Sequence, residues 1–248
     1  MDMGEEHVLF PIHKYGDECM VGCLLIHGFT GSPYEVEPLA TFLDQHTDWK
    51  LVIPTLPGHG ERLALKGIKH TEWMEHAEKE LQQLLKTCKK VYVIGFSMGG
   101  LIASYLSVKY DIQKLVLLSA AAYYLNVKQL WKDIKLLVKE GLQGNLADNE
   151  LYNRYHFKIR KTPISSAQEF RKVVRVVRPL LKRVEIPTFI AQGEKDGIVP
   201  PRSAQYIYEN ISSNEKSMFY SSKAKHLICH SEDNDELFEK ILLFLQEE

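Results

Sequence analysis

The stretch KKVYVIGFSMGGLIASYLSVKY, residues 89–110, has the pattern of a buried strand, a sharp turn and a helix. Its centre, GFSMG at residues 95–99, matches G-x-S-x-G, in which a serine stands on a tight strand-to-helix turn. Gly95 and Gly99 carry no Cβ, so the strand and the helix can approach each other there. The pattern predicts a strained backbone at Ser97 and an exposed hydroxyl at the carboxyl end of a sheet. An ordinary Gly-Ser turn is the alternative.

Strand-like and helical patterns alternate on both sides of this stretch. Apolar strand-like runs start at Met20, Lys50, Ile112, Ile186 and Lys216. Amphipathic helical patterns separate them, as in residues 70–88, and a helical pattern closes the chain. The alternation predicts an α/β fold, with a mostly parallel central sheet covered by helices on both faces.

Two local patterns add detail near the start of the chain. Residues 7–20 are typical of an edge hairpin that turns at residues 15–17. Ser32, Pro33 and Glu35 match a capping box, which predicts a helix that begins at Pro33 and ends near Gln45.

The alternation stops after Ala122 and resumes near residue 184. Residues 123–183 contain helical patterns but no convincing strand, so we expect a helical cap inserted into a core domain of residues 1–122 and 184–248. Such a cap would lie over the carboxyl edge of the sheet, where open α/β sheets bind ligands. Residues 121–183 hold 14 basic and 5 acidic side chains, a balance of +9 in a chain of net charge −1. This charge favours either a solvated surface that pairs with the acidic core or contact with anionic lipid aggregates.

Composition limits the class of protein. A hydrophobic fraction of 45% and a charged fraction of 25% are typical of a globular protein in water. The sequence has no run of about 20 apolar residues and no secretory signal pattern, which predicts a cytoplasmic protein without integral membrane association. Cys19, Cys23, Cys88 and Cys229 form neither C-x-x-C nor zinc spacing, so we expect reduced thiols.

An acid and a base follow Ser97 in the chain. Asp196 comes just after the apolar run IPTFIAQG, and His226 lies in the loop between KSMFYSS and the last helix. Ser, then Asp, then His is one of the orders in which catalytic triads occur. Asp196 alone would suit a plain turn, since Gly197 follows it. His230 is a rival base, but it lies nearer the start of the last helix, so we favour His226.

The loop HGFTG, residues 27–31, follows an early strand and is a candidate oxyanion hole. The N–H of Phe29 is the expected donor from this loop, and the N–H of Met98 is its expected partner. His27 is better explained as a buried structural histidine than as a catalyst. The stretch PGHG at residues 57–60 is better explained as a tight turn than as a phosphate loop.

These motifs together resemble a known family. HGFTG, PGHG, GFSMGG, D-x-x-V-P at residues 196–200 and His226 are similar to the small α/β-hydrolases, and within them to bacterial carboxylesterases and monoacylglycerol lipases. The resemblance implies the α/β-hydrolase fold, a triad of Ser97, Asp196 and His226, an oxyanion hole at Phe29 and Met98, and no cofactor or metal. It implies a serine hydrolase that acts on a small-molecule or lipid ester.

Several alternatives remain open from the sequence. A thioesterase, a C–C bond hydrolase, a haloperoxidase or a non-enzymatic ligand receptor would use the same scaffold. We expect no nucleic-acid partner, and either a monomer or a homodimer. The acyl pocket is expected to use apolar residues of the cap, namely Tyr123, Tyr124, Leu125, Leu130, Trp131, Leu136, Leu137 and Val138.

Overall fold

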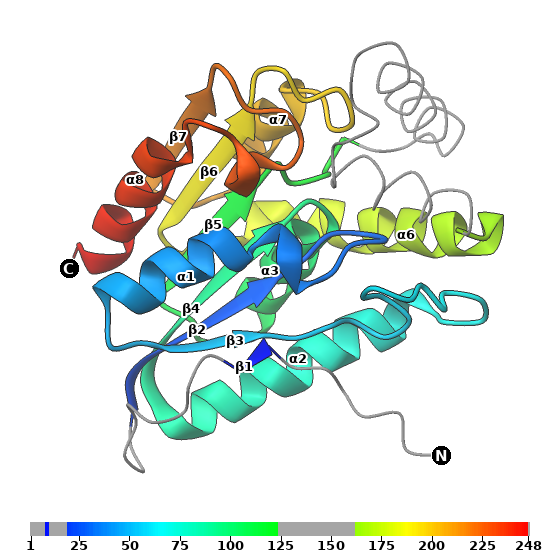
Figure 1. Ribbon diagram of the computed structural model, residues 1–248, viewed down its shortest axis with the longest axis horizontal. Coiled ribbons are helices and arrows are strands. Elements are labelled where there is room, and N and C mark those ends of the chain that lie inside the picture. Colours follow the sequence, from blue (N-terminus) through cyan, green and yellow to red (C-terminus); the bar gives the residue numbers. More distant parts are fainter. Residues whose placement is uncertain (1–7, 10–18, 124–161, 248) are drawn as a thin grey trace.

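The computed structural model describes residues 8–9, 19–123 and 162–247 (Figure 1). Within them a seven-stranded sheet has the order β1-β3-β2-β4-β5-β6-β7, in which all neighbours are parallel except β1 and β3. The strands are β1 (Val8–Leu9), β2 (Cys19–Ile26), β3 (Lys50–Ile53), β4 (Cys88–Phe96), β5 (Lys114–Leu118), β6 (Thr188–Gly193) and β7 (Lys216–Ser221).

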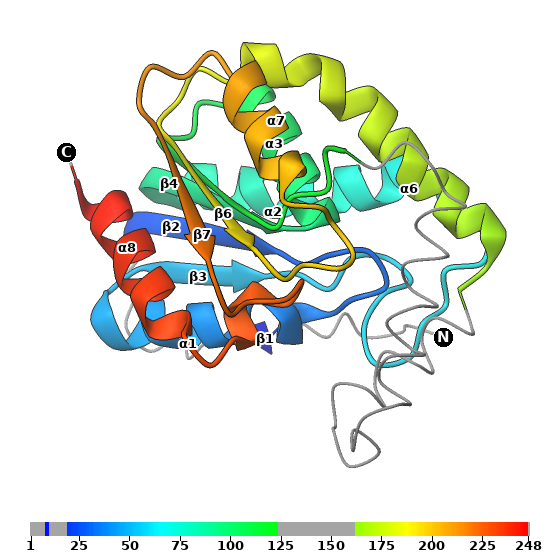
Figure 2. The same ribbon diagram turned by 90° about the horizontal axis from the view of Figure 1, so that it is seen from above.

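Helices cover both faces of the sheet, as Figure 2 shows from above. On one face lie α1 (Glu37–His46) and α8 (Asn234–Gln246), and on the other lie α2 (His70–Thr87), α3 (Met98–Lys109), α6 (Ile164–Val177) and α7 (Arg202–Asn210). Short 3-10 turns are η2 (Pro33–Glu35), η3 (Arg178–Arg183) and η4 (Ile228–His230). The predicted mostly parallel sheet with helices on both faces is confirmed.

Alternation along the strands divides the core into two layers. In β4, Val91 and Val93 pack under α2 and α3, whereas Ile94 and Phe96 pack under α1 and α8. Successive side chains of a strand point to opposite faces, so an almost continuous apolar run serves both layers. The central strands are therefore fixed from both sides, and their carboxyl ends form a firm edge.

The described part of the predicted cap is helical. α6 packs against α3 and α2 and contributes Phe170, Val173 and Val177 to the same core layer as those helices. It is attached there by polar contacts as well, because Ser166 Oγ donates to the carbonyl of Leu65 at 3.1 Å. The boundaries 123 and 183 stay a prediction, since residues 124–161 lie outside the described residues.

Two local predictions differ from the structure. Val8 and Leu9 lie at the sheet edge as expected, but they pair antiparallel with Ile53 and Val52 of β3 and not with β2. The turn predicted at residues 15–17 lies outside the described residues. The capping box is also absent: Ser32 makes no side-chain cap, the 3-10 turn η2 comes first, and α1 starts at Glu37. The Glu35 carboxylate accepts the N–H of Gly28 instead.

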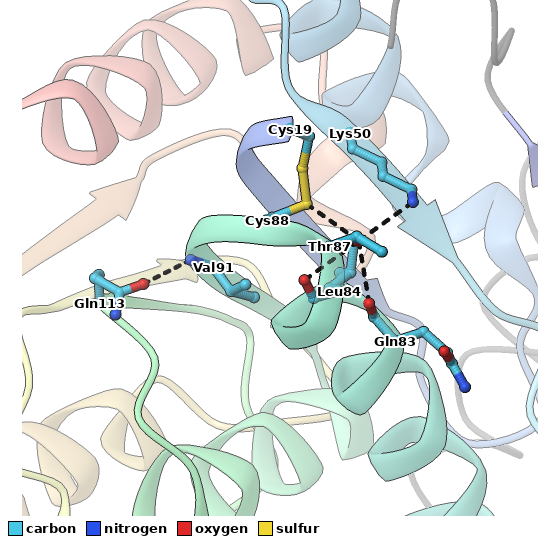
Figure 3. Close-up of a disulfide and its surroundings, with 8 residues drawn as sticks. All are labelled: Cys19, Lys50, Gln83, Leu84, Thr87, Cys88, Val91 and Gln113. Carbon is cyan, nitrogen blue, oxygen red and sulfur yellow. Dashed lines mark hydrogen bonds between the residues drawn. A yellow bond between two sulfur atoms is a disulfide. The ribbon is translucent and has the colours of Figure 1, made fainter. Parts of the chain in front are cut away.

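The expectation of four reduced thiols is wrong as well. Cys19 and Cys88 form a disulfide (Figure 3), with their Cα atoms 4.6 Å apart. They are the first residues of β2 and β4 and lie opposite each other in the parallel register, which brings two residues 69 positions apart into bonding reach. Cys23 and Cys229 are free and buried, and burial raises the pKa of both thiols. The disulfide therefore joins the amino ends of two central strands.

Among the described residues, no helix is both long and apolar enough to cross a membrane.

Candidate functional site

Ser97 stands in the sharp turn between β4 and α3. Its backbone has φ 53° and ψ −113°, which is the strained conformation that the pattern predicts. A Cβ on Gly95 would lie 2.3 Å from the carbonyl oxygen of Gly99, and a Cβ on Gly99 would lie 2.1 Å from that of Ile26. Both glycines are therefore required by the close approach of strand and helix. Ser97 is only 7% exposed, so the prediction that it stands exposed at the edge of the sheet is wrong.

The structure brings Ser97, His226 and Asp196 into one hydrogen-bonded line. His226 Nε2 lies 3.1 Å from Ser97 Oγ, and His226 Nδ1 lies 2.8 Å from Asp196 Oδ2. An ionised carboxylate only accepts hydrogen bonds, so Nδ1–H donates to Asp196. Nε2 of the neutral ring is then left to accept the hydroxyl proton of Ser97. This geometry is that of a nucleophile, a base and an orienting acid.

Asp196 is held by further donors on both carboxylate oxygens. Oδ1 accepts the N–H groups of Ile198 and Val199, each at 2.8 Å, and Oδ2 accepts Gln192 Nε2 at 2.9 Å. These bonds fix the direction of the carboxylate toward His226. Sequence reasoning missed Gln192, although a glutamine in the apolar run TFIAQG, four positions before Asp196, was a usable signal.

His230 lies elsewhere. Its Nε2 is 2.7 Å from the carbonyl oxygen of Tyr34, and its ring stacks on that of Tyr34 at 4.3 Å between centroids. It belongs to η4, and no hydrogen bond of the described residues joins it to Ser97. Of the two candidate bases, the structure therefore brings only His226 to the serine.

The loop HGFTG lies beside the serine turn with its backbone held in place. His27 is fully buried, and its Nε2 accepts the N–H of Leu56 at 3.0 Å. Nδ1 therefore carries the proton and donates to the carbonyl oxygen of Gly28 at 2.9 Å. The N–H of Gly31 donates to the same oxygen at 3.2 Å. His27 has the structural role that the sequence predicts.

The two expected oxyanion donors are backbone N–H groups. The carbonyl of Gly28 and the N–H of Phe29 belong to one planar trans peptide, so they point in opposite directions. Since His27 and Gly31 hold the carbonyl, the direction of the Phe29 N–H is set as well. Met98 is the first residue of α3, so its N–H has no acceptor within the helix. Their assignment as an oxyanion hole remains a prediction.

An aromatic cluster joins the loop to α6. The ring of Phe29 stacks on Phe170 with centroids 5.2 Å apart, and it also meets Trp73 at 5.7 Å and His59 at 6.1 Å. His59 belongs to the PGHG stretch, a turn with positive φ at Gly58 and Gly60. This cluster was not visible in the sequence, because its members come from four separate segments.

Glu169 of α6 forms hydrogen bonds with His70, the first residue of α2. Its carboxylate accepts the His70 N–H at 3.1 Å, lies 2.7 Å from His70 Nδ1, and accepts Lys172 Nζ at 2.7 Å. Burial raises the pKa of Glu169, but the hydrogen bonds from Lys172 and His70 lower it by more than burial raises it. The pKa is therefore about 2, below the ordinary value. An anion at a helix N-terminus is stabilised by the backbone N–H groups there. This contact is a polar joint between α6 and the core.

The remaining predicted site residues are less informative. Tyr123 is half-buried, and its ring contacts the Arg202 guanidinium at 4.3 Å and the ring of Tyr206 at 5.8 Å between centroids. The other residues expected to line an acyl pocket, Tyr124 through Val138, lie outside the described residues. No group of three or more His, Cys, Asp or Glu side chains in the described residues is arranged to hold a metal ion.

The parallel sheet, the strained serine turn and the hydrogen-bonded line of three side chains define the α/β-hydrolase class. The family model described as "Serine aminopeptidase, S33" (Hydrolase_4) matches residues 21–233. The chain belongs to this family, and it is a serine hydrolase. The family prediction made from the sequence motifs is confirmed.

Similar proteins agree with this class. The chain is 27% identical to a thermostable monoacylglycerol lipase of Bacillus sp. (strain H-257), over 93% of this chain and 92% of that protein. It is 22% identical to a carboxylesterase of Bacillus subtilis (strain 168), over 94% of each. A solved structure from work on LipS and LipT, two metagenome-derived lipolytic enzymes, superposes with a TM-score of 0.78 at 21% identity, over 99% of each chain.

Proposed function

We propose that this serine hydrolase cleaves carboxylic esters, of the carboxylesterase or monoacylglycerol lipase type, through an acyl-enzyme on Ser97. The observation that carries the proposal is the line of hydrogen bonds from Asp196 through His226 to Ser97. The names of the two Bacillus relatives support esters as the substrate class.

In this mechanism Ser97 Oγ attacks the ester carbonyl while His226 Nε2 takes its proton. Asp196 keeps the ring in the required tautomer and stabilises the imidazolium. The N–H groups of Phe29 and Met98 bind the developing oxyanion. His226 then protonates the leaving alcohol, and water resolves the acyl-enzyme. Each step uses only protein groups and water.

The acyl group of the substrate is proposed to be medium or long. The aromatic rings of Phe29, Phe170 and Trp73 pack together at the proposed oxyanion loop, and apolar surroundings of this kind suit hydrocarbon better than small polar acids. A series of p-nitrophenyl esters from acetate to laurate would measure this preference. We expect kcat/KM to rise with chain length, and a maximum at acetate would contradict the proposal.

Two experiments test the reaction itself. A fluorophosphonate probe should label the wild-type protein and leave Ser97→Ala unlabelled, because a ligand receptor has no activated serine. Thioesters, diketones and peracid formation, measured beside esters, separate the other enzymes of this scaffold. Higher kcat/KM on any of these than on every ester would overturn the ester assignment.

The basic side chains of residues 121–183 are proposed to keep the cap soluble and to pair with acidic groups of the core domain. Capture of anionic lipid aggregates is the alternative. Arg171 and Arg175 are exposed on α6, while Lys172 pairs with Glu169 at 2.7 Å. Steering by charge would weaken as the Debye length falls from about 10 Å at 0.1 M salt to about 3 Å at 1 M. We expect the ratio of kcat/KM on anionic and neutral micelles of a monoacylglycerol to stay flat over this range. A ratio that falls with salt would favour capture of anionic aggregates.

A further inference from the structure

Glu35 is a buried carboxylate that the proposed reaction does not use. It is 3% exposed and lies in η2, directly after the HGFTG loop. Burying a carboxylate is unfavourable unless other groups compensate for the lost hydration. Its Oε2 accepts the N–H of Gly28 at 2.7 Å, a short bond between a backbone donor and a side chain seven residues further on. The loop therefore closes around this carboxylate.

Two glycines of the loop leave room for the carboxylate. A Cβ on Gly31 would lie 2.0 Å from Glu35 Oε2, so a side chain at this position would displace it. A Cβ on Gly28 would lie 3.1 Å from Glu35 Oε2 and also 3.1 Å from Ser97 Cβ. The carboxylate is therefore within about 6 Å of the side chain of Ser97.

The contact with Gly28 completes the restraint on one peptide unit. The carbonyl of Gly28 is held by His27 and Gly31, and its N–H is held by Glu35. With both sides of Gly28 fixed, neither peptide plane that flanks this residue can rotate freely. The next N–H along the chain is that of Phe29, the proposed oxyanion donor.

The charge of Glu35 also acts on the segment that carries the base. Burial raises the pKa of the Cys229 thiol, and the negative charge of Glu35 adds to this rise. Cys229 lies in η4, three positions after His226. The segment that carries Glu35 also contacts η4 directly, because His230 Nε2 lies 2.7 Å from the carbonyl oxygen of Tyr34, the residue before Glu35.

We propose that Glu35 is a positioning residue, whose carboxylate holds the Gly28 peptide so that the Phe29 N–H points at the place where the oxyanion forms. The proposal rests on the proposed ester hydrolysis. A donor that matches the oxyanion better than the substrate carbonyl stabilises the transition state alone. Loss of Glu35 should therefore lower kcat and leave KM nearly unchanged.

The test compares Glu35→Ala and Glu35→Gln on a soluble p-nitrophenyl ester. We expect Glu35→Ala to lower kcat by about 10²- to 10³-fold, the effect of losing one oxyanion donor, with KM within about threefold of wild type. Glu35→Gln retains an oxygen acceptor for Gly28 and should recover at least about tenfold of the loss. Glu78→Ala is the control, because it removes a carboxylate that is bonded by Lys109 and Tyr110 but lies on α2.

A trifluoromethyl ketone, whose adduct with Ser97 carries an oxyanion, gives a second measurement. Its inhibition constant should rise in Glu35→Ala by the same factor as kcat/KM falls, whereas binding of the corresponding unreactive alcohol should not change. If Glu35→Ala does not fold, Glu35→Asp replaces it, since the shorter side chain keeps the charge but withdraws it from Gly28. We expect it to lower kcat at constant KM.

Three results would overturn the proposal. The first is a kcat within about threefold of wild type in a folded Glu35→Ala or Glu35→Asp protein. The second is an equal loss of kcat in Glu78→Ala, which would indicate a general effect on stability. The third is a loss that appears in KM instead of kcat. If the wild-type protein neither turns over esters nor reacts with the fluorophosphonate, the proposed function itself fails, and the role of Glu35 fails with it.

Discussion

The two ends of β4 are held in different ways. At its amino end, Cys88 is bonded covalently to Cys19 of the neighbouring strand (Figure 3). Just past its carboxyl end, Ser97 has a strained backbone with φ 53° and is joined to His226 by a hydrogen bond of 3.1 Å. The covalent bond lies where the backbone is regular, and the strain lies where the proposed chemistry takes place. A nine-residue strand separates the two, so stability and reactivity are expected to change independently.

The largest effect on ester turnover is expected from a substitution just past the carboxyl end of β4. Ser97→Ala removes the nucleophile, and we expect ester turnover to fall by about 10⁶-fold, as in measured triads. The side chain is small and the disulfide is remote, so the melting temperature should stay close to that of wild type. Purified Ser97→Ala protein with near wild-type turnover would falsify the proposed role of Ser97.

The two candidate bases provide the next comparison. His226→Ala should abolish the burst of acylation, because no other described side chain is placed to take the proton of Ser97. His230→Ala should keep most of the activity, since its ring bonds and stacks on Tyr34. Pre-steady-state release of p-nitrophenol measures both. The reverse pattern would move the base to His230.

Removing the disulfide at the amino end of β4 should lower the free energy of unfolding and leave turnover nearly unchanged. Replacing both Cys19 and Cys88 by alanine opens a loop closed over 69 positions, which on the chain-entropy account lowers the free energy of unfolding by about 4 kcal/mol. Urea unfolding of the variant and of wild type with and without reductant measures this. Because the bond lies at the far end of β4, we expect kcat to stay within about twofold. A large loss of kcat at temperatures where the variant is fully folded would show that the two ends are coupled.

The sequence predicted the carboxyl end much better than the amino end. Ser97, Asp196 and His226 each follow a strand, and carboxyl ends of parallel strands meet at one edge, so chain order was enough to bring them together. The pairing of Cys19 with Cys88 depends on the register between two strands, which hydrophobic pattern does not specify. Glu35 was misread for a related reason: the pattern S-x-x-E fits a capping box, but the carboxylate contacts a loop that precedes it. The spacing of S-x-x-E does not specify the direction in which the Glu35 side chain points.

A smaller effect is expected at the joint between α6 and α2, which belongs to neither end of β4. Glu169→Gln removes a buried charge that accepts bonds from His70 and Lys172. We expect the free energy of unfolding at pH 7 to fall by about 1.5–3 kcal/mol, the range for hydrogen bonds to charged groups. Glu75→Gln, at an exposed position on α2, the helix that Glu169 contacts from α6, is the matched control and should change stability little.

The pH dependence of this difference identifies its origin. The pKa of Glu169 is about 2 in the folded protein, below its ordinary value of 4.5, so the folded state favours the charged form. Its contribution is therefore fully present above about pH 4.5 and is lost as the pH falls toward 2. Urea unfolding of wild type and Glu169→Gln across this range should show two stabilities that converge at low pH. A difference in the free energy of unfolding that stays constant with pH would contradict this account. It would mean that Glu169 stabilises the contact between α6 and α2 by packing and not by its charge.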